Sequence, residues 1–172
     1  MELPGSGYFQ TLALFSVTFG GFAVLVAVFR QMIGGRLSDF DMFFIRSTLL
    51  RSFMAAGCSM LPSLLALFEI SPSIIWRVSS LITGLLLIIF TLTWYAERRA
   101  ASDMPYSRAF RVNFLLQMLT AIFLLAIASG TILEPVPGYF AAAVSMIMVT
   151  AVIAYMAQLR LLLQAQTTGK RK

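Results

Sequence analysis

Five apolar runs dominate this sequence, and each is close to the roughly 20 residues that a helix needs to cross a lipid bilayer. They lie at about residues 8–29, 48–70, 74–95, 110–133 and 139–159, with short polar segments between them. Apolar residues make up 59% of the chain and charged residues 12%, which is about half of the charge that a soluble domain carries. A soluble fold of 172 residues has too little interior for so much apolar surface. The sequence therefore predicts an all-α, polytopic membrane protein: a single domain, 1–172, formed by a bundle of five transmembrane helices.

Positive charge is unevenly distributed between the ends of these expected helices. If five spans alternate in direction, 12 of the 13 Lys and Arg residues fall on one side of the membrane, and Arg77 falls on the other. Cytoplasmic segments of membrane proteins carry the excess of Lys and Arg. We therefore expect the N-terminus outside and the C-terminus in the cytoplasm. Residues 1–7 contain no Lys or Arg, so the basic segment of a cleaved signal peptide is missing and the first span is expected to be retained.

The net charge of +6 would suggest nucleic acid as a partner if the chain were soluble. In a membrane protein, cations at helix ends face anionic lipid headgroups instead, so we expect lipids as partners and no nucleic acid. The planar fork of arginine pairs with phosphate at two points. The candidates for binding an anionic lipid or another anion are Arg46, Arg51, Arg108 and Arg111. Topology and ordinary ion pairs are the simpler interpretation of the same residues.

The second expected span has one face of small or polar residues, spaced three or four apart: Thr48, Arg51, Ala55, Ser59, Pro62, Ala66 and Glu69. This face allows two interpretations. It could form a wall of a water-filled path. It could also serve close helix packing, because small residues let helix backbones approach each other in a bilayer, and we favour this simpler interpretation.

The fourth expected span carries Asn113, Gln117 and Thr120 on one helical face. Amides buried in hydrocarbon need hydrogen-bond partners, so this face should meet other helices rather than lipid. Arg51 is expected at a similar depth, and we predict that it forms a hydrogen-bonded cluster with Asn113 and Gln117. Fastening the second span to the fourth is favoured over a ligand site. Together, the candidates for a polar interior or a pore lining are Thr48, Arg51, Ser59, Asn113, Gln117 and Thr120.

Two other spans carry rows of small residues that predict helix contacts. The first span has Ser16, Gly20, Ala23 and Ala27 on one face, and the third has Ser80, Gly84 and Thr91. These rows match no cofactor-binding motif.

Several kinds of chemistry lack their usual residues. The chain contains no histidine, which is the usual haem ligand and the commonest zinc ligand. No acidic residue lies near the middle of an expected span, where a proton-coupled transporter would need one. The single cysteine, Cys58, has no second cysteine for an internal disulfide. We expect no catalytic residue, no metal site and no cofactor.

These patterns predict a small, non-enzymatic membrane protein that acts as a homo-oligomer or as a subunit of a larger membrane complex. Five helices with several small-residue rows offer more packing faces than one compact bundle needs. The alternative is a small channel or passive transporter with an arginine-rich cytoplasmic mouth that prefers anions. The short loops and small size favour a bacterial cytoplasmic membrane.

Overall fold

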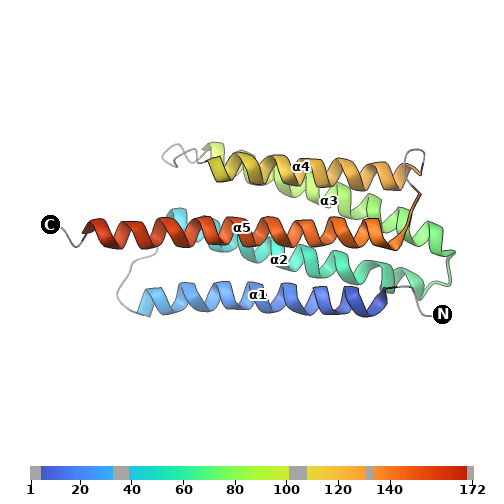
Figure 1. Ribbon diagram of the computed structural model, residues 1–172, viewed down its shortest axis with the longest axis horizontal. Helices are drawn as coiled ribbons and strands as arrows, with labels where there is room; N and C mark the ends of the chain where they lie inside the picture. The colour runs from blue at the N-terminus through green and yellow to red at the C-terminus, as the bar shows by residue number, and fades with distance from the viewer. Residues whose placement is uncertain (1–4, 33–38, 101–107, 131–133, 170–172) are drawn as a thin grey trace.

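The computed structural model describes residues 5–32, 39–100, 108–130 and 134–169, and all regular secondary structure in these ranges is α-helical (Figure 1). The five helices are α1 (Ser6–Met32), α2 (Asp39–Ala66), α3 (Pro72–Ala100), α4 (Arg108–Ser129) and α5 (Pro137–Gly169). Each contains a segment long and apolar enough to cross a membrane: Ser6–Phe29, Ile45–Ala66, Pro72–Arg99, Phe110–Ser129 and Pro137–Ala157. The predicted all-α chain with five helices of membrane-spanning length is confirmed.

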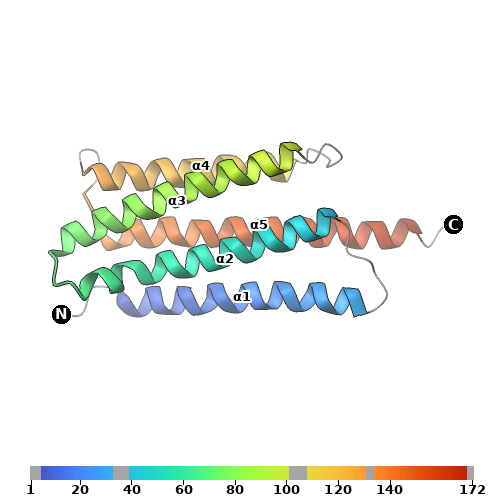
Figure 2. The ribbon, with the colours of Figure 1, turned by 180° about the vertical axis from the view of Figure 1, so that it is seen from behind.

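Successive helices run in opposite directions, so each end of the bundle collects alternate helix ends (Figures 1 and 2). At one end, α1, α3 and α5 finish and α2 and α4 begin. We call it the basic end, because the helical segments there carry Arg30, Arg46, Arg98, Arg99 and Arg111. At the opposite end, the lone cation among the described residues is Arg77.

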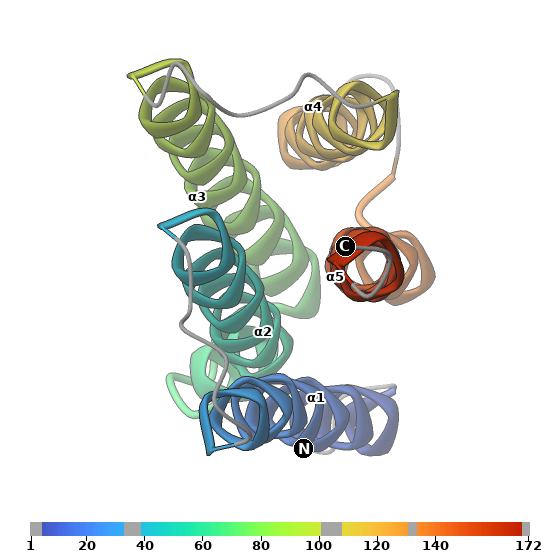
Figure 3. The same cartoon turned by 90° about the vertical axis from the view of Figure 1, so that its left-hand side faces the viewer.

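Four helices form a ring, and the fifth lies outside it (Figure 3). In this ring α2 contacts α3 and α5, and α4 contacts the same two helices from the other side. Helix α1 packs along α2 and touches α5 over a short stretch. It reaches α3 through a side-chain contact between Phe9 and Trp76. The interior of the molecule is therefore built mainly by α2, α3, α4 and α5.

Helix α2 ends earlier than the sequence predicts, at Ala66 instead of near Ile70. Its last turn tightens, because the N–H groups of Leu67 and Phe68 donate to carbonyl groups only three residues before them. Glu69 then takes a left-handed conformation with φ of 56°, which commonly ends a helix. Pro72 starts α3 soon afterwards, in the first helical position, where its missing N–H costs nothing.

Helix α4 also ends earlier, at Ser129, because the next residue is a left-handed glycine. Gly130 has φ of 64°, and its N–H donates to the carbonyl oxygen of Ile127 at 3.1 Å. A Cβ at this position would lie 2.6 Å from Nη2 of Arg77, so the arginine occupies the space beside the glycine. This places a cation at the carboxyl end of α4, where the helix dipole favours positive charge.

The predicted small-residue rows lie at helix contacts. A Cβ at Gly20 of α1 would lie 3.0 Å from Cβ of Ser52 in α2. A Cβ at Gly84 of α3 would lie 3.3 Å from Cβ of Leu124 in α4. The neighbouring members of both rows are buried: Ser16, Ala23, Ser80 and Thr91. Close backbone approach therefore defines the α1–α2 and α3–α4 contacts.

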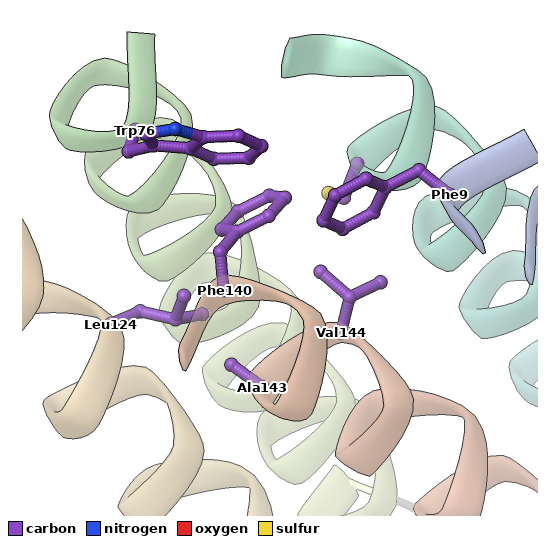
Figure 4. Close-up of a cluster of buried hydrophobic side chains, with 7 residues drawn as sticks. Phe9, Trp76, Leu124, Phe140, Ala143 and Val144 are labelled. Atoms are coloured by element: carbon purple, nitrogen blue, oxygen red, sulfur yellow. The ribbon is translucent and has the colours of Figure 1, made fainter. Parts of the chain in front are cut away.

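An apolar cluster from all five helices fills the end of the bundle away from the basic end (Figure 4). The rings of Phe9, Trp76 and Phe140 meet there, with centroids 5.7–5.9 Å apart. The other members are Cys58, Leu124, Ala143 and Val144. Trp76 lies near the start of α3, and its side chain points inward and is buried.

Candidate functional site

Polar side chains from all four ring helices meet inside the bundle, in the half nearer the basic end. Arg51 comes from α2, Thr91 from α3, Asn113 and Gln117 from α4, and Thr150 from α5. We call these five residues the polar layer. Each is at most 2% exposed, so the layer is closed to water and to lipid.

The contact between Arg51 and Asn113 joins α2 to α4. The side-chain oxygen of Asn113 accepts hydrogen bonds from Nη1 of Arg51 at 2.9 Å and from Nη2 at 3.2 Å. Its side-chain nitrogen donates to the backbone oxygen of Thr150 at 3.1 Å. The amide orientation is assigned from these bonds, because the reverse orientation would set acceptor against acceptor and donor against donor. Asn113 thereby connects three helices of the ring.

Gln117 extends the polar layer to α3. The hydroxyl of Thr91 lies 3.1 Å from Oε1 of Gln117 and 2.6 Å from the backbone oxygen of Leu87, so its single hydrogen is shared between two acceptors. Nε2 of Gln117 donates to Oγ1 of Thr150 at 3.4 Å. The predicted contact between Arg51 and Asn113 is present, and Gln117 is connected to that pair through Thr150.

Aromatic rings cover the guanidinium groups of two buried arginines. Cζ of Arg51 lies 4.4 Å from the ring centroid of Trp94 and 5.6 Å from that of Phe90. Trp94 stacks on Phe110 at 4.5 Å, and Cζ of Arg98 lies 3.8 Å from the Phe110 ring. A ring face carries partial negative charge, so these contacts stabilise the cations.

Arg51 has no carboxylate partner among the described residues. Its ring and amide contacts offset only part of the cost of burying a full charge, which is high in a membrane interior. The polar layer therefore carries positive charge at its centre. Its geometry can fasten four helices together, and its charge suits an anionic group.

The other predicted interior positions are buried outside the polar layer. Ser59 donates to the backbone oxygen of Ala55 at 2.7 Å, and Thr120 donates to that of Leu116 at 2.8 Å. Both hydroxyl groups are thus used within their own helices. Thr48 lies one turn before Arg51 on α2 and is 1% exposed.

The candidate anion-binding arginines occupy different places. Arg46 is exposed, and its Nη2 lies 3.8 Å from Oε1 of Glu97 on α3. Arg111 is also exposed, on α4, whereas Arg51 is enclosed in the ring. Arg108 begins α4, and its side chain lies outside the described residues. The structure therefore separates Arg51 from the surface cations.

Two important contributors did not stand out in the sequence. Trp94 lies near the end of α3, where tryptophan commonly sits at the membrane interface, but it is 4% exposed and packs under Arg51. Thr150 is one of several hydroxyl-bearing residues in an apolar run. Its depth could have identified Thr150 as a partner of Gln117, because both residues lie about equally far from the basic end of their spans.

The chain matches no protein-family model, no curated protein and no solved structure. The chemical character of the site is therefore inferred from its residues alone. Its central group is the Arg51 guanidinium, which contacts one amide and two aromatic faces inside a ring of four helices.

Proposed function

We propose that this chain is a non-enzymatic integral membrane protein that acts as a homo-oligomer, or as a subunit of a larger complex, through α1. The position of α1 is the observation that carries this proposal. It buries 22% of its membrane-spanning segment, the smallest share of the five helices, whereas α5 buries 50%. Helix α1 is therefore the element with the most surface left for a partner in the membrane.

The open surface of α1 includes a regular row of large apolar side chains. Phe15, Phe22, Leu25 and Phe29 are each more than half exposed. Their spacings of seven, three and four residues place them on one helical face, as in the seam of two helices that pack side by side. Packing and van der Waals contact drive helix association in a bilayer. The same row on a second copy offers a matching surface.

Orientation and compartment are part of the proposal. We place the basic end in the cytoplasm, because the positive-charge excess there follows the usual rule for membrane proteins. We also propose a bacterial cytoplasmic membrane, which suits the short connections between helices. Lipid headgroups, including anionic ones, would then lie against the exposed Arg46 and Arg111.

An anion-preferring channel or passive transporter stays a second proposal. The charge of Arg51 inside the helix ring supports it. The burial of Arg51, Ser59 and Asn113 supports helix fastening instead, because these side chains expose at most 2% of their surface. The oligomer is therefore the function that the described contacts favour.

Cysteine crosslinking in native membranes tests the oligomer. In a Cys58→Ala background, Phe22→Cys and Leu25→Cys should form disulfide-linked dimers under mild oxidation. Ile122→Cys is the matched control, because Ile122 is as exposed as Phe22 but lies on α4. Equal crosslinking at Ile122, or no dimer from either α1 position, would contradict a homo-oligomer formed through this face.

A further inference from the structure

We propose that Arg51 is the centre of a binding site for one phosphate group inside the helix ring. Three buried polar atoms near this residue have no hydrogen-bond partner in the described structure: Nε of Arg51, Oγ1 of Thr48 and Nε1 of Trp94. This proposal does not depend on the oligomeric state of the chain.

The three atoms belong to one small region. Thr48 and Arg51 are three residues apart on α2, so both side chains lie on the same inward face. The Trp94 ring lies 4.4 Å from Cζ of Arg51. Each of the three groups carries a hydrogen to donate. A buried donor without an acceptor is costly, so this region is suited to receive acceptor atoms from outside the chain.

The external group that supplies these acceptor atoms should carry negative charge. Arg51 is 0% exposed and has no carboxylate partner among the described residues, so a neutral acceptor would leave its charge uncompensated. Asn113 occupies the edge of the guanidinium formed by Nη1 and Nη2, and this contact fixes the orientation of the group. The edge that includes Nε remains for a second ligand. Arginine forks bind the planar carboxylate and the phosphate group at two points, with hydrogen bonds about twice as strong as neutral ones.

The position of the site indicates how an anion reaches it. Arg51 lies six residues inside the start of the α2 span, on the side of the basic end. Among neighbours in the ring, α2 and α3 share the sparsest contact, and Arg51 and Trp94 lie on these two helices. An anion that enters from the basic end would separate α2 from α3 locally. It would replace the packing contacts between these helices with hydrogen bonds to Thr48, Arg51 and Trp94. A lipid headgroup and a dissolved phosphate ion present the same chemistry there.

Fluorescence of Trp94 reports directly on this site. The chain has two tryptophans, so Trp76→Phe leaves Trp94 as the single tryptophan, which is excited selectively above the tyrosine absorption band. The protein, purified in mild detergent and stripped of lipid, is titrated with inorganic phosphate, with phosphatidylglycerol and with phosphatidylcholine. We expect a saturable change in emission with phosphate or phosphatidylglycerol and none with phosphatidylcholine. A response to phosphate indicates a dissolved ion, and a response to phosphatidylglycerol alone indicates a lipid headgroup.

Thr48→Val separates a binding role from a structural one. Valine keeps the shape of threonine and removes a hydroxyl that has no partner, so thermal stability should hold or rise while anion binding weakens about tenfold. Thr120→Val is the matched control, because the Thr120 hydroxyl already bonds within its own helix. The Thr120→Val protein should bind the anion as tightly as the parent does. Arg51→Gln should abolish the response.

Either of two results would overturn the site. One is the absence of a saturable response to both phosphate and phosphatidylglycerol in the Trp76→Phe protein. The other is an equal response in Thr48→Val and Thr120→Val. The test stands even if Arg51→Gln does not fold, since Thr48→Val removes no contact within the chain. Crosslinking through α1 is read separately, so the oligomer and the anion site can fail independently.

Discussion

Arg51 is the residue on which the interior of this protein depends most. It is fully enclosed, yet its guanidinium meets an amide oxygen and aromatic faces instead of a carboxylate. Such an arrangement is sensitive to single changes, because a buried charge that loses a hydrogen-bond acceptor has no water to replace it. The neighbouring residue Asn113 supplies that acceptor.

Two substitutions of Asn113 should lower stability by different amounts. Asn113→Ala removes the acceptor and should lower the free energy of unfolding by about 1–3 kcal/mol. Asn113→Asp keeps the acceptor and adds a charge opposite Arg51, but it loses the donor to the backbone oxygen of Thr150, so it should lower stability less than Asn113→Ala does. Thermal unfolding in mild detergent measures both, with the exposed Arg111→Gln as a control that should leave the midpoint unchanged. An Asn113→Ala protein as stable as the parent would show that this contact does not hold α2 to α4.

At this scale the sequence predicted which polar residues would turn inward but missed some of their partners. Asn113 and Gln117 were identifiable, because amides are costly in hydrocarbon and must find partners. The inward position of Trp94 was harder to predict, because an indole near a helix end can lie at the membrane interface or pack against a buried cation. Thr150 was missed because a hydroxyl can bond to its own helix and so needs no partner elsewhere.

Among the elements, α1 and α3 depend on glycine for their closest contacts. Gly20 faces Ser52 of α2 at a distance that leaves no room for a larger side chain, whereas Gly21 has nothing within 4 Å. These adjacent residues offer a matched pair in the same helix. The fit of α1 on α2 can therefore be tested with two variants that share the same change in helix propensity and nearly the same depth in the membrane.

Gly20→Leu should push α1 away from α2 and destabilise the fold by about 1–3 kcal/mol, as overpacking does in other cores. Gly21→Leu should be close to neutral, because its side chain points away from the other helices. Unfolding midpoints of the two variants in the same detergent provide the comparison. Equal midpoints would contradict the α1–α2 contact as described.

The number and approximate position of the helices followed from the apolar runs, and their exact ends did not. The early end of α4 depends on Gly130, whose left-handed conformation accommodates Arg77 from another helix. The early end of α2 depends on a left-handed Glu69, a conformation that a non-glycine residue rarely adopts. Both ends are set by local backbone conformation rather than by hydrophobicity.

The whole molecule is a ring of α2 to α5 with α1 attached to its side (Figure 3). The sequence predicted a five-helix bundle but not this arrangement. In a membrane helix the lipid-facing and the helix-facing surfaces are both apolar, so apolar periodicity does not indicate which neighbour a face meets. The polar layer supplies that information for α2 and α4, and α1 contributes no residue to this layer.

The five-span topology with a cytoplasmic basic end is tested most directly by measuring on which side of the membrane each end of the bundle lies. In a Cys58→Ala background, Ser73→Cys marks the end where α3 begins, and Thr168→Cys marks the basic end, near the end of α5. A maleimide reagent that does not cross membranes should label Ser73→Cys in intact cells and Thr168→Cys only after permeabilisation. Labelling of both positions from the same side, or the reverse pattern, would contradict five spans with a cytoplasmic basic end.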